Sequence, residues 1–375
     1  MFANEGACRN PAGAVLCITG DSRREHSRFS EDEVRGFFRM KKYNIAVLGA
    51  TGAVGREMLK VIEEYQIPVG TLLPLASAKS AGTEIDFMGG KVKVQEATEE
   101  SFQGMDYVLG AVQNPMSKKF APAIVRSGAV YIDNSSAFRM DPDVPLVVPE
   151  INGEDAFQNK GIIANPNCST IITLMAVAGI AKLSPIRSMV ACTYQAVSGA
   201  GVNGTRELED QMHALANGGE IVHKTFPAQI AANVIPFIGE MKDNLYTSEE
   251  MKMQNEGRRI LHLPELLVTC TCVRVPVMRS HSISVTLRTE RKISIAEANE
   301  AIRAFEGVRL IEDIEGRCYP TPLDTTDQDL VYVGRVRDDL TDDHGLTLWC
   351  CGDQVRKGAA SNAVQIMKKL IEKAD

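Results

Sequence analysis

The chain has 375 residues, of which 44% are hydrophobic and 24% charged, and its formal net charge is -7. A chain of this length is usually divided into two domains. Nucleic-acid-binding proteins normally carry a basic surface, so the acidic balance argues against a nucleic-acid partner. No stretch approaches the ~20 apolar residues of a membrane span. We therefore expect a globular protein that binds neither nucleic acid nor membrane.

Nine cysteines are present, an odd number with no regular framework and no secretory leader before them. This pattern favours free thiols in the reducing cytoplasm over a set of disulfides. Cys270 and Cys272 alternate along a strand-like run, and Cys350 and Cys351 are adjacent. None of these pairs has the CxxC spacing or the nearby histidines of a zinc site, so we expect no metal.

The first 39 residues mix both charge signs and show no sustained hydrophobic period. They lack the features of a secretory signal or a transit peptide. Met40 then begins "MKKYNIAVLGATG", a suitable start for a cytoplasmic enzyme. We expect residues 1–39 to be a disordered extension.

A glycine-rich turn follows the first apolar strand, in "YNIAVLGATGAVG" (43–55), and leads into the helix-like "REMLKVIEEY". Gly49, Gly52 and Gly55 are spaced so that the backbone can approach a pyrophosphate at a helix N-terminus. Thr51, Ala53 and Val54 belong to the same turn. The pattern indicates a dinucleotide site, although a purely structural turn is the alternative.

The next strand, near "TLLPLAS", is followed by "SAKSAG" and has no acid before Glu84. NAD-binding proteins tend to place Asp or Glu about 20 residues beyond the glycines, to hold the ribose hydroxyls. Ser77, Lys79 and Ser80 instead place a cation between hydroxyls, which suits a 2′-phosphate. This predicts NADP as the cofactor, the alternative being that Lys79 is a solvated loop residue.

Strand-like runs at 106–112 and 129–136 flank a helix-like segment at 117–128. Such alternation of strands and helices is typical of a parallel, doubly wound sheet.

The segment "NPNCSTI" (165–171) places Cys168 ahead of a long apolar run. A residue before proline avoids the helical conformation, so the helix should begin at about Cys168. A thiol at a helix N-terminus has a lowered pKa, and the free N–H groups there, with the Asn167 amide, can hold an oxyanion. We predict a nucleophilic cysteine; the alternative is an ordinary buried thiol.

A nucleophilic cysteine needs a base. Of the six histidines, His281 begins "HSISVTLRT", whose alternating apolar residues mark a half-buried strand. A side chain at the start of a strand can reach a cleft, so His281 is the candidate, with a surface histidine as the alternative.

The motifs "GATGAVG", "NSSAFRM", "NPNCSTI", "QAVSGAG", "EEMK", "RVPVMRSH" and "CGDQVRKGAASNAVQI" follow in the order seen in aspartate-semialdehyde dehydrogenases. The chain resembles this family from about Met40 to the C-terminus. The resemblance implies a cytoplasmic homodimer that uses NADPH to reduce L-4-aspartyl phosphate to aspartate semialdehyde and phosphate. The reaction belongs to lysine, threonine, methionine and diaminopimelate biosynthesis.

The resemblance also implies residue roles. Cys168 would be the nucleophile, His281 the acid/base, and Gln195 would orient the substrate. Arg274 would bind the substrate α-carboxylate, and Glu249 would bind its amino group. Lys252 and Arg139 would bind the phosphate. Glu249 and Lys252 share a helix face, so without the resemblance they could be a surface ion pair. Further cofactor contacts are expected at Ser198, Gly199 and Gln354.

The implied fold is α/β, a Rossmann-type nucleotide-binding domain plus a mixed α/β catalytic and dimerisation domain. The first domain would comprise 40–167 with the C-terminal helix of 355–375, and the second would be 168–354.

Two rivals stay open. "GRCYPT" (316–321) resembles the nucleophile region of N-acetylglutamyl-phosphate reductases. We nevertheless expect Cys318 to be a loop cysteine, and Arg274 and Glu249 discriminate between the two substrates. A catalytically silent NADP-binding regulator is the second rival, and the set Cys168, His281 and Gln195 argues against it.

Overall fold

A computed structural model describes residues 41–313 and 315–374. The prediction for residues 1–39 therefore lies outside the described residues.

The first sheet is parallel throughout and has the strand order β5-β2-β1-β6-β7-β8. Its strands are β1 (Tyr43–Leu48), β2 (Val69–Ala76), β5 (Gln95–Glu96), β6 (Tyr107–Gly110), β7 (Val130–Asp133) and β8 (Ile162–Ala164). A parallel sheet buries both faces, which explains the near-continuous apolar runs of β1 and β6. The predicted doubly wound sheet is confirmed.

Helices cover both faces of this sheet. On one face α2 (Ala53–Glu64) packs with the C-terminal helix α10 (Ser361–Ala374). On the other face lie α3 (Asn114–Arg126) and the short 3-10 turn η1 (Glu99–Phe102). Helix α3 begins three residues earlier than predicted, because Pro115 occupies its first turn, where proline is tolerated. A hairpin of β3 (Glu84–Phe87) and β4 (Gly90–Lys93) lies beyond β2.

The second sheet is mixed, with the order β10-β9-β11-β14-β13-β12. Its strands are β9 (Ile186–Gln195), β10 (Leu267–Arg274), β11 (His281–Thr289), β12 (Val308–Leu310), β13 (Val331–Asp338) and β14 (Gly345–Gly352). One face is covered by α5 (Cys168–Leu183), α7 (Ser248–Ile260) and α8 (Ile295–Ala304). Helix α5 is buried almost all round, as expected for a helix at the centre of a core.

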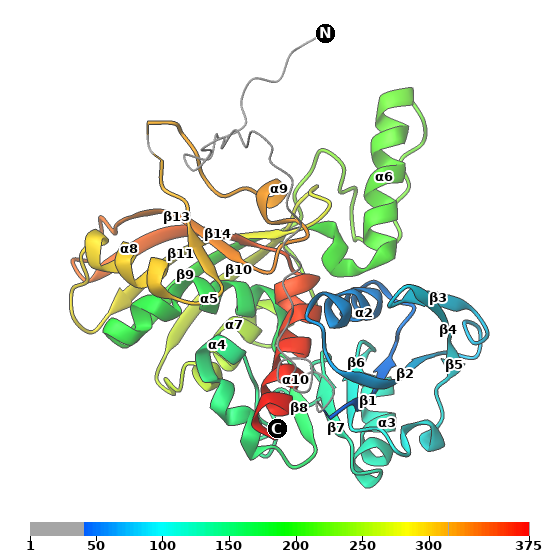
Figure 1. The fold of residues 1–375 in the computed structure, drawn as a ribbon. Coiled ribbons are helices and arrows are strands. Elements are labelled where there is room, and N and C mark those ends of the chain that lie inside the picture. Colours follow the sequence, from blue (N-terminus) through cyan, green and yellow to red (C-terminus); the bar gives the residue numbers. More distant parts are fainter. Residues whose placement is uncertain (1–40, 314, 375) are drawn as a thin grey trace, which may run out of the picture.

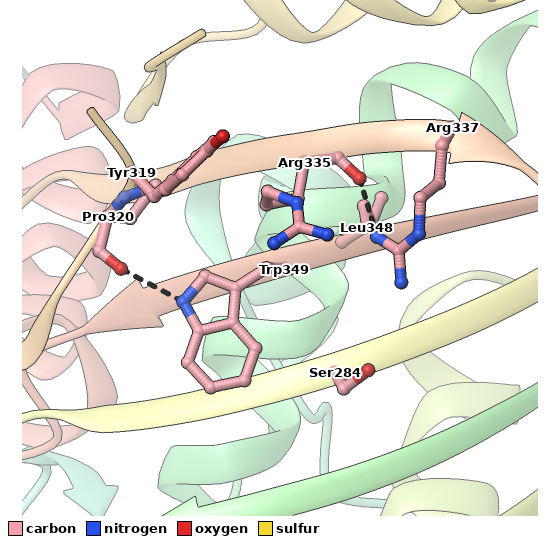
Figure 2. Close-up of a pocket in the computed structure, with 7 residues that line it drawn as sticks. All are labelled: Ser284, Tyr319, Pro320, Arg335, Arg337, Leu348 and Trp349. Atoms are coloured by element: carbon pink, nitrogen blue, oxygen red, sulfur yellow. Dashed lines mark hydrogen bonds between the residues drawn. The ribbon is translucent and has the colours of Figure 1, made fainter. Parts of the chain in front are cut away.

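The opposite face of the second sheet is partly exposed. Tyr194 and Trp349 lie there with ring centroids 5.5 Å apart, and Val190 is 48% exposed. A hollow of about 330 Å³ lies on this face, and Figure 2 shows seven residues that line it. Within it Trp349 donates its indole N–H to the Pro320 carbonyl at 2.9 Å, and Arg335 lies over the Tyr319 ring.

The remaining elements are short, apart from α6 (Val202–Asn217), which projects from the molecule in Figure 1. Helix α6 packs on the loop around Phe226 and Ile230 in a small separate core. The other helical turns are α4 (Pro149–Asn152), η2 (Gly153–Gln158), η3 (Val197–Ala200) and α9 (Pro322–Thr325).

A π-helical turn, η4 (Arg356–Ala360), leads from the second sheet into α10 and contacts both α2 and α5. Arg356 in this turn pairs with Glu57 and Glu64 of α2 and with Asp329, which lies just before β13. The last helix of the chain therefore returns to the first sheet, and Figure 1 shows it (red) between the two sheets.

Across the described ranges, no helix combines the length and apolar character needed to cross a membrane.

Candidate active site

The glycine turn between β1 and α2 is tight in the way the sequence predicted. Gly49 has a φ of +89°, and a methyl group there would lie 2.4 Å from the Ala111 carbonyl oxygen. A methyl group on Gly55 would lie 2.2 Å from the Gly49 carbonyl oxygen, which explains why both positions require glycine. Helix α2 has no side-chain cap and no acid in its first turn. Its first N–H groups are thus suited to an anionic ligand.

The loop after β2 lies beside this turn, because the N–H groups of Gly49 and Ala50 both donate to the Leu75 carbonyl. Ser77 and Lys79 are exposed at the end of β2, and Ser80 is half-buried. Among the described residues Lys79 forms no ion pair. Its ammonium group is therefore available to a ligand.

Helix α5 begins at Cys168, as predicted, and Asn167 is its N-cap. The Asn167 side-chain oxygen accepts the N–H groups of Ser169 and Thr170 at 3.1 and 3.2 Å. Its amide nitrogen donates to Glu249 at 2.9 Å. The Asn167 amide, which we expected to face an oxyanion, is thus engaged on both sides in this structure.

His281, the first residue of β11, faces the thiol. Its Nε2 lies 3.5 Å from the Cys168 sulfur. The main-chain N–H of Ala196 donates to Nδ1 at 3.1 Å. A neutral imidazole that accepts at Nδ1 carries its proton on Nε2, so His281 presents an N–H to the sulfur.

The ionisation of this pair differs from the sequence prediction. Burial raises the pKa of Cys168 to about 12, with Glu249 acting in the same direction, although Lys252, Arg139 and Arg274 lower it. Burial, followed by the charge of Arg274, lowers the pKa of His281 to about 3. The expected lowering of the Cys168 pKa is therefore wrong, because burial outweighs the helix N-terminus and the nearby cations.

Glu249, Lys252 and Gln195 form one cluster with Asn167. Lys252 donates to Glu249 at 2.8 Å, and the Gln195 amide donates to the same carboxylate at 3.3 Å. Burial alone would raise the pKa of Glu249, but Lys252, Asn167 and Gln195 together lower it to about 2. The predicted i, i+3 pair is confirmed, and it is a partly buried pair rather than a surface one.

The two arginines predicted to bind substrate are both buried. Arg274, the last residue of β10, donates to the Ala196 carbonyl at 2.7 Å, next to His281. Burial lowers its pKa. Arg139 forms an ion pair with Glu256, with 3.1 Å between Nη1 and Oε1. The N–H groups of Arg274 and Arg139 that are not used in these contacts can bind a ligand.

A cavity of about 330 Å³ joins the glycine turn to the nucleophile. Of the predicted residues it is lined by Gly52, Ala53, Val54, Arg139, Asn167, Cys168, Ser198, Gly199 and Gln354. Gln354 accepts the N–H of Ser280 at 2.8 Å and also hydrogen-bonds to the Ser198 hydroxyl. Ser77, Lys79 and Ser80 do not line this cavity and lie farther along the same sheet edge.

Several residues of the site were not predicted. Asn134, which follows β7, lines the cavity, as do Ala111, Gly358 and Ala359. Asn134 could have been found, because the carboxyl ends of parallel strands are where such folds bind ligands. Glu256, the partner of Arg139, gives no comparable signal, since a glutamate within a charged helix is usually solvated.

Cys318 lies in the loop before α9, as predicted, outside the residues that line the cavity. It is disulfide-bonded, so the prediction of free thiols is wrong there, and the cysteine spacing gives no indication of this bond. The other described cysteines are free. In the described part of the chain, no group of three or more His, Cys, Asp or Glu could hold a metal ion.

Two family models match the chain and together span most of the described residues. Residues 44–159 match the NAD binding domain of semialdehyde dehydrogenases, and residues 177–357 match their dimerisation domain.

Similar proteins are known in several bacteria. Aspartate-semialdehyde dehydrogenase of Synechocystis sp. is 45% identical over 329 residues, which cover 88% of this chain and 97% of that protein. The Bacillus subtilis protein of the same name is 44% identical, with 87% and 97% covered. The crystal structure of aspartate semialdehyde dehydrogenase II from Vibrio cholerae, complexed with ASA, superposes with a TM-score of 0.87 at 42% identity. It matches 89% of this chain and 100% of that one.

A cysteine at a helix start with a histidine beside it, and a cavity that joins this cysteine to a glycine turn, agree with these similarities. The chain belongs to the aspartate-semialdehyde dehydrogenase family.

Proposed function

We propose that this chain catalyses the reversible, NADPH-dependent reduction of L-4-aspartyl phosphate to L-aspartate 4-semialdehyde and phosphate, through a thioester on Cys168. The observation that carries the proposal is the Cys168–His281 pair, with 3.5 Å between Sγ and Nε2, together with the cavity that joins Cys168 to the glycine turn. Covalent catalysis at a thiol divides one difficult exchange into two easier steps.

In the reduction, the Cys168 sulfur attacks the carbonyl carbon of the acyl phosphate and the bond to the phosphate oxygen breaks. Arg139 and Lys252 stabilise the departing phosphate, since most of the charge develops there. His281 keeps its proton on Nε2 and donates it in a hydrogen bond to the sulfur, which stabilises the developing thiolate. The proton of the Cys168 thiol passes to the departing phosphate, and the thiolate that is released with the aldehyde takes up a proton from water. Asn167 caps α5 and so fixes the position of Cys168 at the start of this helix.

The cofactor is held by the glycine turn, where the first N–H groups of α2 have no side-chain cap and no acid beside them and therefore suit a pyrophosphate. Thr51, Ala53 and Val54 complete this turn, and Ser198, Gly199 and Gln354 line the continuation toward Cys168. Bound NADPH supplies the hydride that reduces the thioester. We assign NADP rather than NAD because Lys79, between Ser77 and Ser80, is exposed, forms no ion pair with another described residue and suits a 2′-phosphate.

The amino-acid part of the substrate is bound by Arg274 and Glu249, with Gln195 orienting the reacting group. Arginine binds a carboxylate through two parallel N–H groups, which lysine cannot do. Glu249, ionised because of its contacts, suits an ammonium group. This pair favours aspartate semialdehyde over an N-acetylated substrate, whose amide carries no charge.

The experiment is a substrate comparison. NADP reduction is followed at 340 nm with aspartate semialdehyde and inorganic phosphate, and in parallel with N-acetylglutamate semialdehyde. Turnover with the first and not the second is expected, and turnover should require Cys168. Preference for the N-acetylated substrate would support the reductase alternative, and NADP binding without turnover would support the silent regulator.

We further propose that the chain is a cytoplasmic homodimer in which the partly exposed face of the second sheet meets a second copy. The match to a dimerisation domain over residues 177–357 supports the dimer, and the exposed Val190 and Tyr194 suit an apolar contact. The six free cysteines of the described chain favour the reducing cytoplasm. The two proposed domains are 40–167 with 355–375, and 168–354.

A further inference from the structure

Glu256 is a buried carboxylate on α7 that has no assigned role. It is 2% exposed, and each of its oxygens has a different partner. Oε1 accepts from Nη1 of Arg139 at 3.1 Å, whereas Oε2 accepts the main-chain N–H of Asn167 at 2.7 Å. One carboxylate thus joins the arginine to the residue immediately before the nucleophile.

Arg139 is held in one orientation by three acceptors. Besides Glu256, Nε donates to the Asn165 carbonyl at 2.9 Å, and Nη2 donates to the Asn134 carbonyl at 2.7 Å. A guanidinium group has five N–H donors, so the remaining two stay available for a ligand. Since the three acceptors lie on different segments, they fix the direction in which these two N–H groups point.

Helix α7 supplies other parts of the same site. Glu249 lies two turns and Lys252 one turn before Glu256 on this helix, and their pair contacts Asn167 and Gln195. One turn after Glu256, Arg259 donates to the main-chain carbonyls of Arg139 and Val144. The helix therefore contacts both the backbone and the side chain of Arg139.

Burying a charge is costly unless the charge is paired and hydrogen-bonded. Glu256 meets this condition only while Arg139 and Asn167 keep their present positions. Replacing its carboxylate removes an acceptor from one of them, because an amide has one oxygen and one NH₂ group.

We propose that Glu256 is a positioning residue, which holds the phosphate-binding Arg139 and the start of helix α5 at a fixed separation, so that leaving phosphate and nucleophile stay aligned. This rests on the phosphate role assigned to Arg139 under the proposed function. Glu256 itself touches neither substrate nor cofactor.

The test is Glu256→Gln, which preserves size but removes the charge and one acceptor. The KM for inorganic phosphate in the oxidative direction should rise by about tenfold, as expected for loss of a hydrogen bond to a charged group. The KM for aspartate semialdehyde and the Kd for NADP should stay within about twofold of the wild type, because Arg274 and the glycine turn are untouched. An unchanged or lowered phosphate KM overturns the proposal.

Glu250→Gln is the matched control. Glu250 lies on the same helix and accepts the main-chain N–H groups of Thr247 and Cys272 at 2.7 and 3.1 Å, but it contacts neither Arg139 nor Asn167. The variant Glu250→Gln should lower the melting temperature without raising the KM for phosphate. If both variants raise that KM equally, general loosening of α7 explains the effect and the positioning role is wrong.

Binding can be measured without turnover. Inorganic phosphate should protect Cys168 from iodoacetamide, and the half-protecting concentration should rise in Glu256→Gln as the KM does. Should that variant not fold, Glu256→Asp retains the charge but is one methylene shorter, so it can reach only one partner. It should also raise the half-protecting concentration, and wild-type protection in Glu256→Asp overturns the proposal.

Arg139→Lys distinguishes a failure of the positioning role of Glu256 from a failure of the phosphate role of Arg139, on which that role rests. If Arg139→Lys leaves the phosphate KM unchanged, the phosphate role of Arg139 is wrong. If it raises the KM while Glu256→Gln does not, only the inference about Glu256 fails. If Glu256 acts through Arg139, adding Glu256→Gln to Arg139→Lys should change the KM by less than about twofold, and full additivity contradicts the mechanism.

Discussion

Gly358 packs directly against Cys168. A methyl group on Gly358 would lie 2.8 Å from Cβ of Cys168 and 3.2 Å from its Cα. Gly358 belongs to the π-helical turn η4, and its N–H donates to the Asp353 carbonyl at 3.0 Å. The wider turn thus brings a glycine onto the nucleophile, in keeping with the frequent occurrence of π-turns at functional sites.

Gly358→Ala should displace Cys168 and reduce kcat by about a hundredfold, since small displacements of a reacting atom have effects of this size. The Kd for NADP, measured by fluorescence titration, should change much less. Gly128→Ala is a suitable control for stability, because Gly128 has open space around it but a φ of +86°. Normal kcat in Gly358→Ala would show that η4 yields to the added methyl group.

The stability of the protein should depend on His281 between about pH 6.5 and pH 3. Its pKa is about 3 in the folded protein, against an ordinary value of 6.5. As the pH falls below 6.5 the unfolded chain takes up a proton that the folded state does not, so stability is lost through this window. The expected slope from this one group is about 1.4 kcal/mol per pH unit.

Chemical unfolding of wild type and His281→Asn at pH 5 to 6.5 measures this contribution. The variant should show the shallower dependence on pH. Glu249 does not interfere at pH 5 to 6.5, because its pKa is lowered from 4.5 to about 2 and its stabilisation is lost only as the pH falls through that range. Parallel slopes for the two proteins would mean that His281 takes up a proton as readily in the folded protein as in the unfolded chain.

Alkylation of ligand-free enzyme should report the raised pKa of Cys168. Only thiolate reacts, so with a pKa of about 12 the rate should increase by about tenfold per pH unit from pH 7 to 10 without a plateau. Iodoacetamide inactivation followed by peptide mapping is the measurement. Cys192, which is also partly exposed, serves as the internal reference. A plateau of the rate below pH 8 would show that the pKa of Cys168 is lowered, as the position at the helix N-terminus predicts.

Lys79→Glu should weaken NADP binding by more than about tenfold while changing NAD binding little, because the new carboxylate repels a 2′-phosphate. The two Kd values are measured by titration of each cofactor. Lys91→Glu, on the β3–β4 hairpin, controls for a general change in charge. Equal losses for NADP and NAD in Lys79→Glu would remove the 2′-phosphate assignment.

Arg274→Leu should raise the KM for aspartate semialdehyde by about a hundredfold, since a buried charged hydrogen-bond partner is lost. Arg274→Lys should recover only part of the loss, because an ammonium group cannot bind a carboxylate through two parallel N–H groups. Steady-state kinetics with the phosphate concentration held saturating gives both values. An unchanged KM for aspartate semialdehyde in Arg274→Leu would mean that another residue binds the substrate carboxylate.

The sequence predicted those parts of the molecule that depend on local chemistry. The tight glycine turn follows from the positions of Gly49 and Gly55, and the start of α5 follows from Pro166 and the capping Asn167. The start of β11 at His281 follows from the alternation of apolar residues behind it. Each of these patterns is complete within about ten residues, so no tertiary information was needed.

Other properties of the site arise only when distant segments meet. Glu256 is 117 residues from Arg139, and its burial could not be inferred from a helix rich in charged residues. The pKa of Cys168 depends on how closely the two halves enclose it, and burial reversed the direction that the helix N-terminus predicts. Gly358 lies 190 positions beyond the cysteine that it contacts, and the disulfide at Cys318 has no signature in the spacing.

The return of η4 and α10 to the first sheet has a consequence for synthesis. Ribosomes deliver the chain from its N-terminus, and Cys168 and His281 emerge well before Gly358 and the helix that follows it. The cavity wall formed by Gln354, Gly358 and Ala359 is complete only after η4 has left the exit tunnel. A chain that stops before η4 would therefore contain the nucleophile and the histidine but lack the finished pocket, so the pocket forms later in synthesis than the reacting pair.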